Sequence, residues 1–183
     1  MVEHTVWKTW KKVRCTRGMV HEYLGMILDF IKGKRKGVKV IICDQVADIV
    51  DTSSLNLKKG DIALTPAAKN LFKVGTGEKL DIDRKEVYHS CVAKSLFVSK
   101  RARPDINPTV AVLSTRVKDP NESDWGKLKR SMMYLNGIRG KCLFLCIDNM
   151  SVIKWWVDAA FGAVIRVFIL YMVTKIIYVQ KVD

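Results

Sequence analysis

The chain has 183 residues, and 49% of them are hydrophobic, which is enough to form a buried core and excludes an intrinsically disordered protein. Its 32 lysines and arginines exceed its 18 aspartates and glutamates and give a formal net charge of +14 at pH 7. This excess favours a phosphate-rich partner, either nucleic acid or an anionic membrane surface, and we expect no small-molecule substrate. A solvated basic surface without a specific partner is the alternative.

The cysteines and histidines indicate neither disulfides nor a metal site. There are five cysteines, an odd number, and no two of them have C-x-x-C spacing. Cys142 and Cys146 alternate with apolar residues, so they should lie on one face of a strand. We therefore expect reduced, partly buried thiols, and the three widely separated histidines give no support to a zinc site.

The two ends of the chain bear on its location. The first 18 residues contain no continuous apolar run, so we expect no signal peptide and favour the cytoplasm or nucleus. Residues 157–179 are apolar enough to be considered as a membrane span, for which about 20 apolar residues suffice. Asp158, Arg166 and Lys175 argue against a span, since a central arginine costs about 2.5–3.5 kcal/mol on insertion. A membrane anchor therefore stays the disfavoured alternative.

A β-hairpin is expected near the start of the chain. Residues 22–30 (EYLGMILDF) alternate as one strand, with Leu24, Met26, Leu28 and Phe30 on one face. The turn KGKRKG follows, and residues 38–42 continue the alternation. The basic residues of this turn, which we call the turn cations, are Lys32, Lys34, Arg35 and Lys36. They are either phosphate contacts or charges that keep an exposed loop soluble, and we weigh the two equally.

The middle of the chain predicts helices on both sides of a long connection. Residues 44–51 should form a short helix with Val46, Ile49 and Val50 on one side. Residues 52–82 are rich in Gly, Pro, Ser and Asp, which predicts an extended linker over the surface. A helix should then run from Asp83, paired with Glu86 in a capping box, to about residue 100. Its inward positions should be Tyr88, Cys91, Val92, Ser95 and Leu96.

Two further helices and two strands complete the expected elements. Asn107 should cap a helix with Pro108 at its first position and an apolar stripe at Val110, Leu113 and Val117. Residues 119–122 should start a third helix that ends at Gly137, with Trp125, Leu128, Met132 and Leu135 in the core. Residues 141–147 and 152–161 should pair as strands.

These elements predict an α+β fold. A β-hairpin comes first, a three-helix group follows, and an incomplete strand pair precedes an apolar tail. The expected divisions of the chain are residues 1–51, 52–82, 83–140, 141–161 and 162–183.

Several short motifs occur in an order that is informative together, although each is weak alone. They are YLGM at 23–26, TP at 65–66, Tyr88/Val92/Leu96, RPDI at 103–106, Pro120/Trp125/Arg130/Tyr134/Leu135/Gly137 and Asp158. This set resembles the junction between the distal reverse transcriptase and RNase H in copia-type retrotransposon polyproteins. The resemblance covers about residues 17–161 and implies a truncated thumb and connection region followed by the start of RNase H.

The resemblance also implies which chemistry is missing. The parent family uses Mg²⁺, and its polymerase holds two metal ions with an adjacent aspartate pair, which this sequence lacks. Asp158 matches the first RNase H carboxylate, but residues 162–183 depart from the family and supply no later ones, as a frameshifted or unrelated tail would. We therefore expect no enzymatic activity, no cofactor and no bound metal.

A thumb region holds duplex nucleic acid through its phosphates. Arg116, Lys127 and Arg130 are the candidate phosphate contacts on the helices, together with Lys34, Arg35 and Lys36 in the turn. For Arg103, we favour a structural role in which it orders a turn through the following aspartate. Three hypotheses stay open: a non-catalytic remnant that binds nucleic acid, a fragment active with a complementing palm chain, and a membrane protein anchored by its tail.

Overall fold

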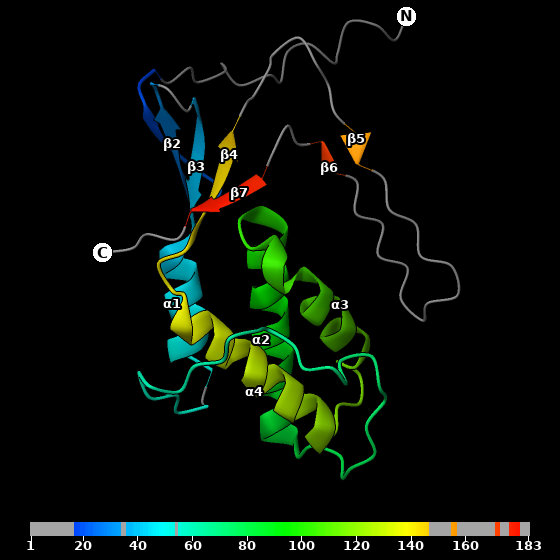
Figure 1. The fold of residues 1–183 in the computed structure, drawn as a ribbon. Coiled ribbons are helices and arrows are strands. Elements are labelled where there is room, and N and C mark those ends of the chain that lie inside the picture. Colours follow the sequence, from blue (N-terminus) through cyan, green and yellow to red (C-terminus); the bar gives the residue numbers. More distant parts are fainter. Residues whose placement is uncertain are drawn as a thin grey trace, which may run out of the picture.

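The protein is described from a computed structural model that covers residues 17–33, 36–53 and 55–146, together with the backbone of three short strands further along. An antiparallel sheet lies at one end of a group of helices, with α1 directly beneath the strands (Figure 1). The sheet order is β1-β2-β3-β4-β7. The described residues therefore have a mixed α+β arrangement.

The first two strands replace the single strand expected over residues 22–30. Strand β1 (Val20–Tyr23) and strand β2 (Met26–Ile31) pair antiparallel, with Tyr23 opposite Met26. Leu24 and Gly25 form the two-residue turn, with φ angles of 48° and 74°. Two consecutive left-handed residues reverse the chain, so Leu24 is 58% exposed and does not join the apolar face of Met26 and Leu28.

The hairpin across the basic turn is confirmed. Strand β3 (Gly37–Ile41) pairs antiparallel with β2, with Leu28 opposite Val40 and Phe30 opposite Val38. Val40 is buried in the core, and Leu28 and Val38 pack against it. This face of the hairpin therefore covers the helical group.

The pairing of β4 differs from the expected hairpin between residues 141–147 and 152–161. Strand β4 (Cys142–Cys146) pairs with β3 along one edge and with β7 (Ile176–Val179) along the other. Both edges of β4 are therefore occupied by strands other than the expected partner. Strand β5 (Trp155–Trp156) pairs instead with β6 (Tyr171–Met172). The strand after the helices thus extends the sheet of the N-terminal hairpin.

Both cysteines of β4 are buried, as expected for two residues on one face of a strand. Among the described residues, Cys43, Cys91 and Cys142 are free thiols. Burial raises the pKa of the Cys91 thiol. Cys15 lies outside the described residues.

Helix α1 (Cys43–Asp51) buries Val46, Ile49 and Val50, as predicted. Helix α2 (Ile82–Arg101) ends one residue beyond the expected end, but its N-terminal cap was assigned to the wrong aspartate. Asp81, not Asp83, is the N-cap, and its side chain accepts the backbone N–H of Arg84. The N-cap lies two residues earlier than expected, but the inward face is as predicted apart from Leu96, which is 40% exposed.

A 3-10 turn, η2 (Pro104–Ile106), leads into helix α3 (Asn107–Thr115). Asn107 is therefore the first residue of α3 and is buried, whereas Ile106 is in the cap position. The prediction of Asn107 as the cap was wrong because η2 runs directly into α3 and leaves no extended residue for capping. Val117 lies beyond the end of α3 and is half-buried.

Helix α4 (Glu122–Gly137) is the helix whose start the sequence predicts best. Asn121 and Asp124 form a capping box, in which each side chain accepts the other residue's backbone N–H. Leu128, Met132 and Leu135 are fully buried, as the apolar stripe predicts, and Trp125 is half-buried. The helix ends at Gly137, as expected.

The linker, defined as residues 55–81, contains no helix or strand in the part of the chain that the structure describes. It runs beside α4 (Figure 1) and is bonded to it along its length. Asn136 Nδ2 donates to the carbonyls of Lys58 and Asp61, at 2.9 and 3.0 Å, and Asn121 Nδ2 donates to the Gly75 carbonyl at 2.8 Å. The extended connection is therefore a fixed covering of this helix.

No helix in the described part of the chain is both long and apolar enough to cross a membrane. The side chains of residues 157–179, on which the membrane alternative rests, lie outside the described residues.

Candidate functional site

A buried ion pair joins η2 to α4. The side chain of Arg103 is 0% exposed; its Nη2 donates to Asp105 Oδ2 at 2.9 Å and its Nε donates to Oδ1 at 3.1 Å. The hydroxyl of Tyr134 on α4 donates to the same Asp105 Oδ2 at 2.8 Å. Arg103 Nη1 also reaches the carbonyl of Ile138, just after α4, at 3.4 Å. The structural role expected for Arg103 is confirmed.

The titration of this cluster reflects its burial. Burial alone would raise the pKa of Asp105, but the hydrogen bonds and charge of Arg103, with the Tyr134 hydroxyl, lower it overall. Burial and the hydrogen bond to Asp105 raise the pKa of Tyr134 to about 12. The ground state is therefore a carboxylate held by a guanidinium and a neutral phenol, an arrangement that fixes backbone geometry.

Two of the predicted phosphate contacts share one buried carboxylate. Arg116 Nε lies 3.2 Å from Asp124 Oδ2, and Lys127 Nζ lies 3.7 Å from Asp124 Oδ1. The Asp124 side chain is only 1% exposed. Lys127 also donates to the carbonyl of Lys73 in the linker at 2.7 Å, and its side chain is 10% exposed. Arg116 and Lys127 therefore brace the segments around the start of α4.

The third predicted contact, Arg130, binds the linker. Its Nη2 donates to Thr65 Oγ1 at 3.0 Å, while its Nε is buried and has no hydrogen-bond partner among the described residues. Arg130 and Lys127 are three residues apart on α4, so they lie on one face of the helix.

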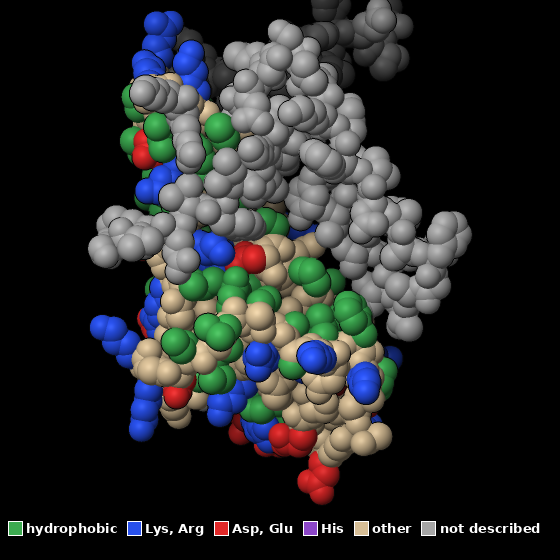
Figure 2. All heavy atoms as spheres, viewed as in Figure 1, with side chains coloured by type: hydrophobic (Ala, Val, Ile, Leu, Met, Phe, Trp, Pro, Cys, Tyr) green, Lys and Arg blue, Asp and Glu red, His purple; other side chains and the backbone are tan. Residues whose placement is uncertain are grey.

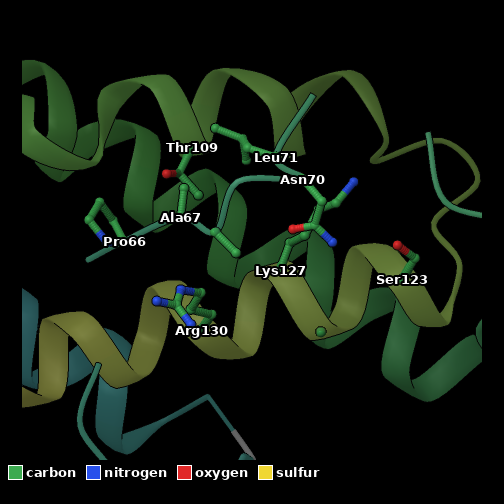
Figure 3. Close-up of a pocket in the computed structure, with 10 residues that line it drawn as sticks. Pro66, Ala67, Asn70, Leu71, Thr109, Ser123, Lys127 and Arg130 are labelled. Carbon is green, nitrogen blue, oxygen red and sulfur yellow. The ribbon is translucent and has the colours of Figure 1, made fainter. Parts of the chain in front are cut away.

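A pocket of about 370 Å³ lies between the linker and α4 (Figure 3). Figure 3 shows linker residues along one side, Lys127, Arg130 and Ser123 along the α4 side, and Thr109 of α3 at the back. Its lining consists of Pro66, Ala67, Ala68, Asn70, Leu71, Thr109, Ser123, Gly126, Lys127 and Arg130. This pocket could not be predicted from the sequence, because it depends on where the linker lies.

A second arginine contact was also missed. Arg84, in the first turn of α2, donates through Nη2 to Glu122 Oε2 at 2.9 Å and lies 4.6 Å from the centre of the Trp125 ring. The first turns of the two helices are thereby joined. The sequence shows only a basic residue near one helix start and an acidic residue near another. These positions do not specify that the two residues pair.

The turn cations are placed differently from the α4 cations. Lys32 and Lys36 are exposed, and Lys36 forms no ion pair with another described residue; Lys34 and Arg35 lie outside the described residues. Figure 2 shows Lys and Arg side chains gathered at the end of the sheet away from the helices.

The described residues contain no group of three His, Cys, Asp or Glu side chains placed to hold a metal ion. Asp158, which the resemblance matches to an RNase H carboxylate, lies outside the described residues. The described side chains therefore do not fit the two-metal site that polymerase or RNase H chemistry needs.

Comparison with known proteins gives one informative relative. The chain is 27% identical over 149 residues to a Saccharomyces cerevisiae protein named for transposon Ty5-1. The similarity supports a transposon-derived chain. The aligned region covers 80% of this chain and 46% of the yeast protein, so the chain spans less than half of that relative. No family model matches the sequence. No solved structure matches it either.

Proposed function

We propose that the chain is a non-catalytic remnant of a copia-type reverse transcriptase and RNase H polyprotein that retains sequence-independent affinity for duplex nucleic acid. The ordered motifs and the similarity to the Ty5-1 protein support the origin. The excess of lysine and arginine supports the phosphate-rich partner.

One structural observation carries the proposed origin. Residues of separate motifs bond to one another: Tyr134 binds Asp105, which also holds Arg103, and Arg130 binds Thr65. The paired residues are 29 and 65 positions apart in the chain. Motifs that merely recurred by chance would have no reason to meet in the fold. Their contacts support a single inherited folding unit.

The proposed lack of catalysis rests on the sequence. Two-metal phosphoryl chemistry needs several converging carboxylates, and the chain contains no adjacent aspartate pair in a Tyr-x-Asp-Asp turn. Asp158 alone cannot hold two metal ions. What remains is binding through positive charge.

The turn cations are the proposed duplex contact. Arg116 and Lys127 neutralise the buried Asp124, and turning both outward to a duplex would leave that carboxylate buried without a counter-charge. Lys32 and Lys36, at the two ends of the turn, hold no carboxylate among the described residues. Contacts to phosphates fix position without distinguishing sequence, so binding should be equally strong to unrelated duplexes of the same length.

Duplex binding should depend steeply on salt, and the turn cations should account for part of that dependence. Each phosphate contact adds about 0.9 to the slope of log affinity against log salt concentration. Replacing Lys32, Lys34, Arg35 and Lys36 with glutamine should therefore reduce the slope by up to about 3.6. Fluorescence anisotropy with a labelled duplex in a salt series measures this change.

The matched control replaces four exposed linker lysines, Lys58, Lys59, Lys69 and Lys73, with glutamine and changes the net charge equally. It should leave the slope closer to that of the unmodified chain. Equal slopes for the two variants would contradict the assignment to the turn. Binding to anionic vesicles without duplex binding would favour the membrane alternative, and primer extension after addition of a palm fragment would favour the complemented enzyme.

A further inference from the structure

The pocket between the linker and α4 is lined by hydrogen-bonding side chains, and its two cations lie on the α4 side. Lys127 and Arg130 supply two cations, and Asn70, Thr109 and Ser123 supply neutral polar groups. Pro66, Ala67, Ala68 and Leu71 make the remainder apolar, and the lining contains no carboxylate. Such a mixture suits a ligand with an anionic group and a small apolar part.

The positive charges around the pocket exceed the negative charges. The nearby Asp124 carboxylate is shared by Arg116 and Lys127. Arg130 has only a neutral hydroxyl partner, and its Nε is buried without a partner among the described residues. The Nε is too buried for a ligand to reach, but a guanidinium has five N–H donors, and the bond to Thr65 uses only one of them. Lys127 keeps donors too, because an ammonium has three and one is used by the Lys73 carbonyl.

The α4 wall leaves room for such a ligand. Gly126 lines the pocket between Ser123 and Arg130, and a Cβ placed there would meet no heavy atom within 4 Å. Glycine within a helix is destabilising relative to alanine, so this position sacrifices some helix stability and keeps the pocket wide. The volume of about 370 Å³ falls in the range of small-molecule sites.

We propose that this pocket binds one phosphate monoester group, with the phosphate against Arg130 and Lys127 and the attached organic part against the apolar wall. Arginine and lysine form short charge-assisted hydrogen bonds to phosphate oxygens, and phosphate is rich in the acceptors that Arg130 lacks. The group could be carried by a free small molecule or by a strand end of nucleic acid. The site does not rest on the duplex binding of the turn cations, since it is recessed and uses other residues.

Titration of the full chain with inorganic phosphate and with phenyl phosphate, at constant ionic strength, tests the site. The amide resonances of Gly126 and Asn70 should shift in a saturable manner, and sodium chloride should not reproduce the shift. Arg130→Gln should weaken phosphate binding by about tenfold or more. Lys129→Gln, an exposed neighbour on α4 that does not line the pocket, should bind as the unmodified chain does.

Gly126→Leu provides a second variant that fills the pocket and leaves every charge in place. It should abolish the binding of phenyl phosphate. If Arg130→Gln does not fold, this variant tests the proposed site in its place. Equal phosphate binding by the Arg130 and Lys129 variants, or unchanged binding by Gly126→Leu, would overturn the proposal.

Tighter binding of a 5′-phosphorylated duplex than of its 5′-hydroxyl form assigns the site to strand ends, and equal binding assigns it to free phosphate esters. Loss of the salt-dependent duplex binding alone would refute the proposed function and leave this site standing.

Discussion

Replacing Arg103 with methionine should lower the free energy of unfolding by about 3–5 kcal/mol. The substitution keeps much of the side-chain volume but removes the cation that holds the Asp105 carboxylate. Asp105 would then remain mostly buried, with Tyr134 as its remaining bonded side chain. A charge that is buried without its counter-charge is among the largest single destabilising changes. Urea unfolding followed by circular dichroism measures the loss.

The matched control is Arg84→Met, which removes an arginine from a bridge to the exposed Glu122. Its effect on unfolding should be much smaller, because exposed ion pairs contribute little. The double variant Arg103→Met with Asp105→Leu should recover part of the loss, since no unpaired charge is then buried. An Arg103 variant no less stable than the Arg84 variant would show that the cluster does not support the fold.

Gly37→Ala should lower the free energy of unfolding by about 1–3 kcal/mol. A Cβ at Gly37 would lie 2.4 Å from the backbone carbonyl oxygen of Leu145 and 2.8 Å from the ring of Phe144. The carbonyl belongs to the β4 backbone and cannot rotate away as a side chain can. The cost arises only if β3 and β4 pair in this register, so the substitution tests the join between the N-terminal hairpin and the strand after the helices. Thermal or urea unfolding reports it.

Gly60→Ala is the control for this substitution. A Cβ there meets no heavy atom within 4 Å and the residue is exposed, so stability should stay close to that of the unmodified chain. If Gly37→Ala proved as stable as Gly60→Ala, β4 would not lie beside β3 in this register.

Elements fixed by local pattern were predictable from the sequence. The apolar stripe of Leu128, Met132 and Leu135 defines the buried face of α4, and the alternation around the basic turn defines the hairpin of β2 and β3. The break between β1 and β2 was missed because Leu24 continues the apolar alternation. A leucine with a positive φ is uncommon, and the sequence does not indicate that Leu24 adopts one.

Pairings between distant segments were not predictable in the same way. The composition of the segment after the helices indicates a strand. It does not indicate which strand that segment pairs with, and in the structure β4 pairs with β3. The role of Arg103 could be predicted because Asp105 is two residues away. Lys127 and Arg130 find their partners 54 and 65 residues away in the linker, so the same basic residues looked free to bind phosphate.

The basic residues that were all predicted to bind phosphate therefore divide into two sets. Those on the helices hold α4, the linker and the segment after α3 together, and they leave one recessed pocket with excess positive charge. Of the turn cations, Lys32 and Lys36 are exposed. Under the two proposals, the cations on the helices stabilise the fold, while the turn and the pocket are the sites of phosphate binding.

The DNA that flanks the coding sequence tests the retroelement origin most directly. Upstream, we predict a reading frame that encodes a Tyr-x-Asp-Asp turn followed by the start of this chain. Downstream, in one of the three frames, we predict the serine- and glycine-rich strand and later carboxylates of RNase H. Flanking sequence with neither feature in any frame would contradict a copia-type origin.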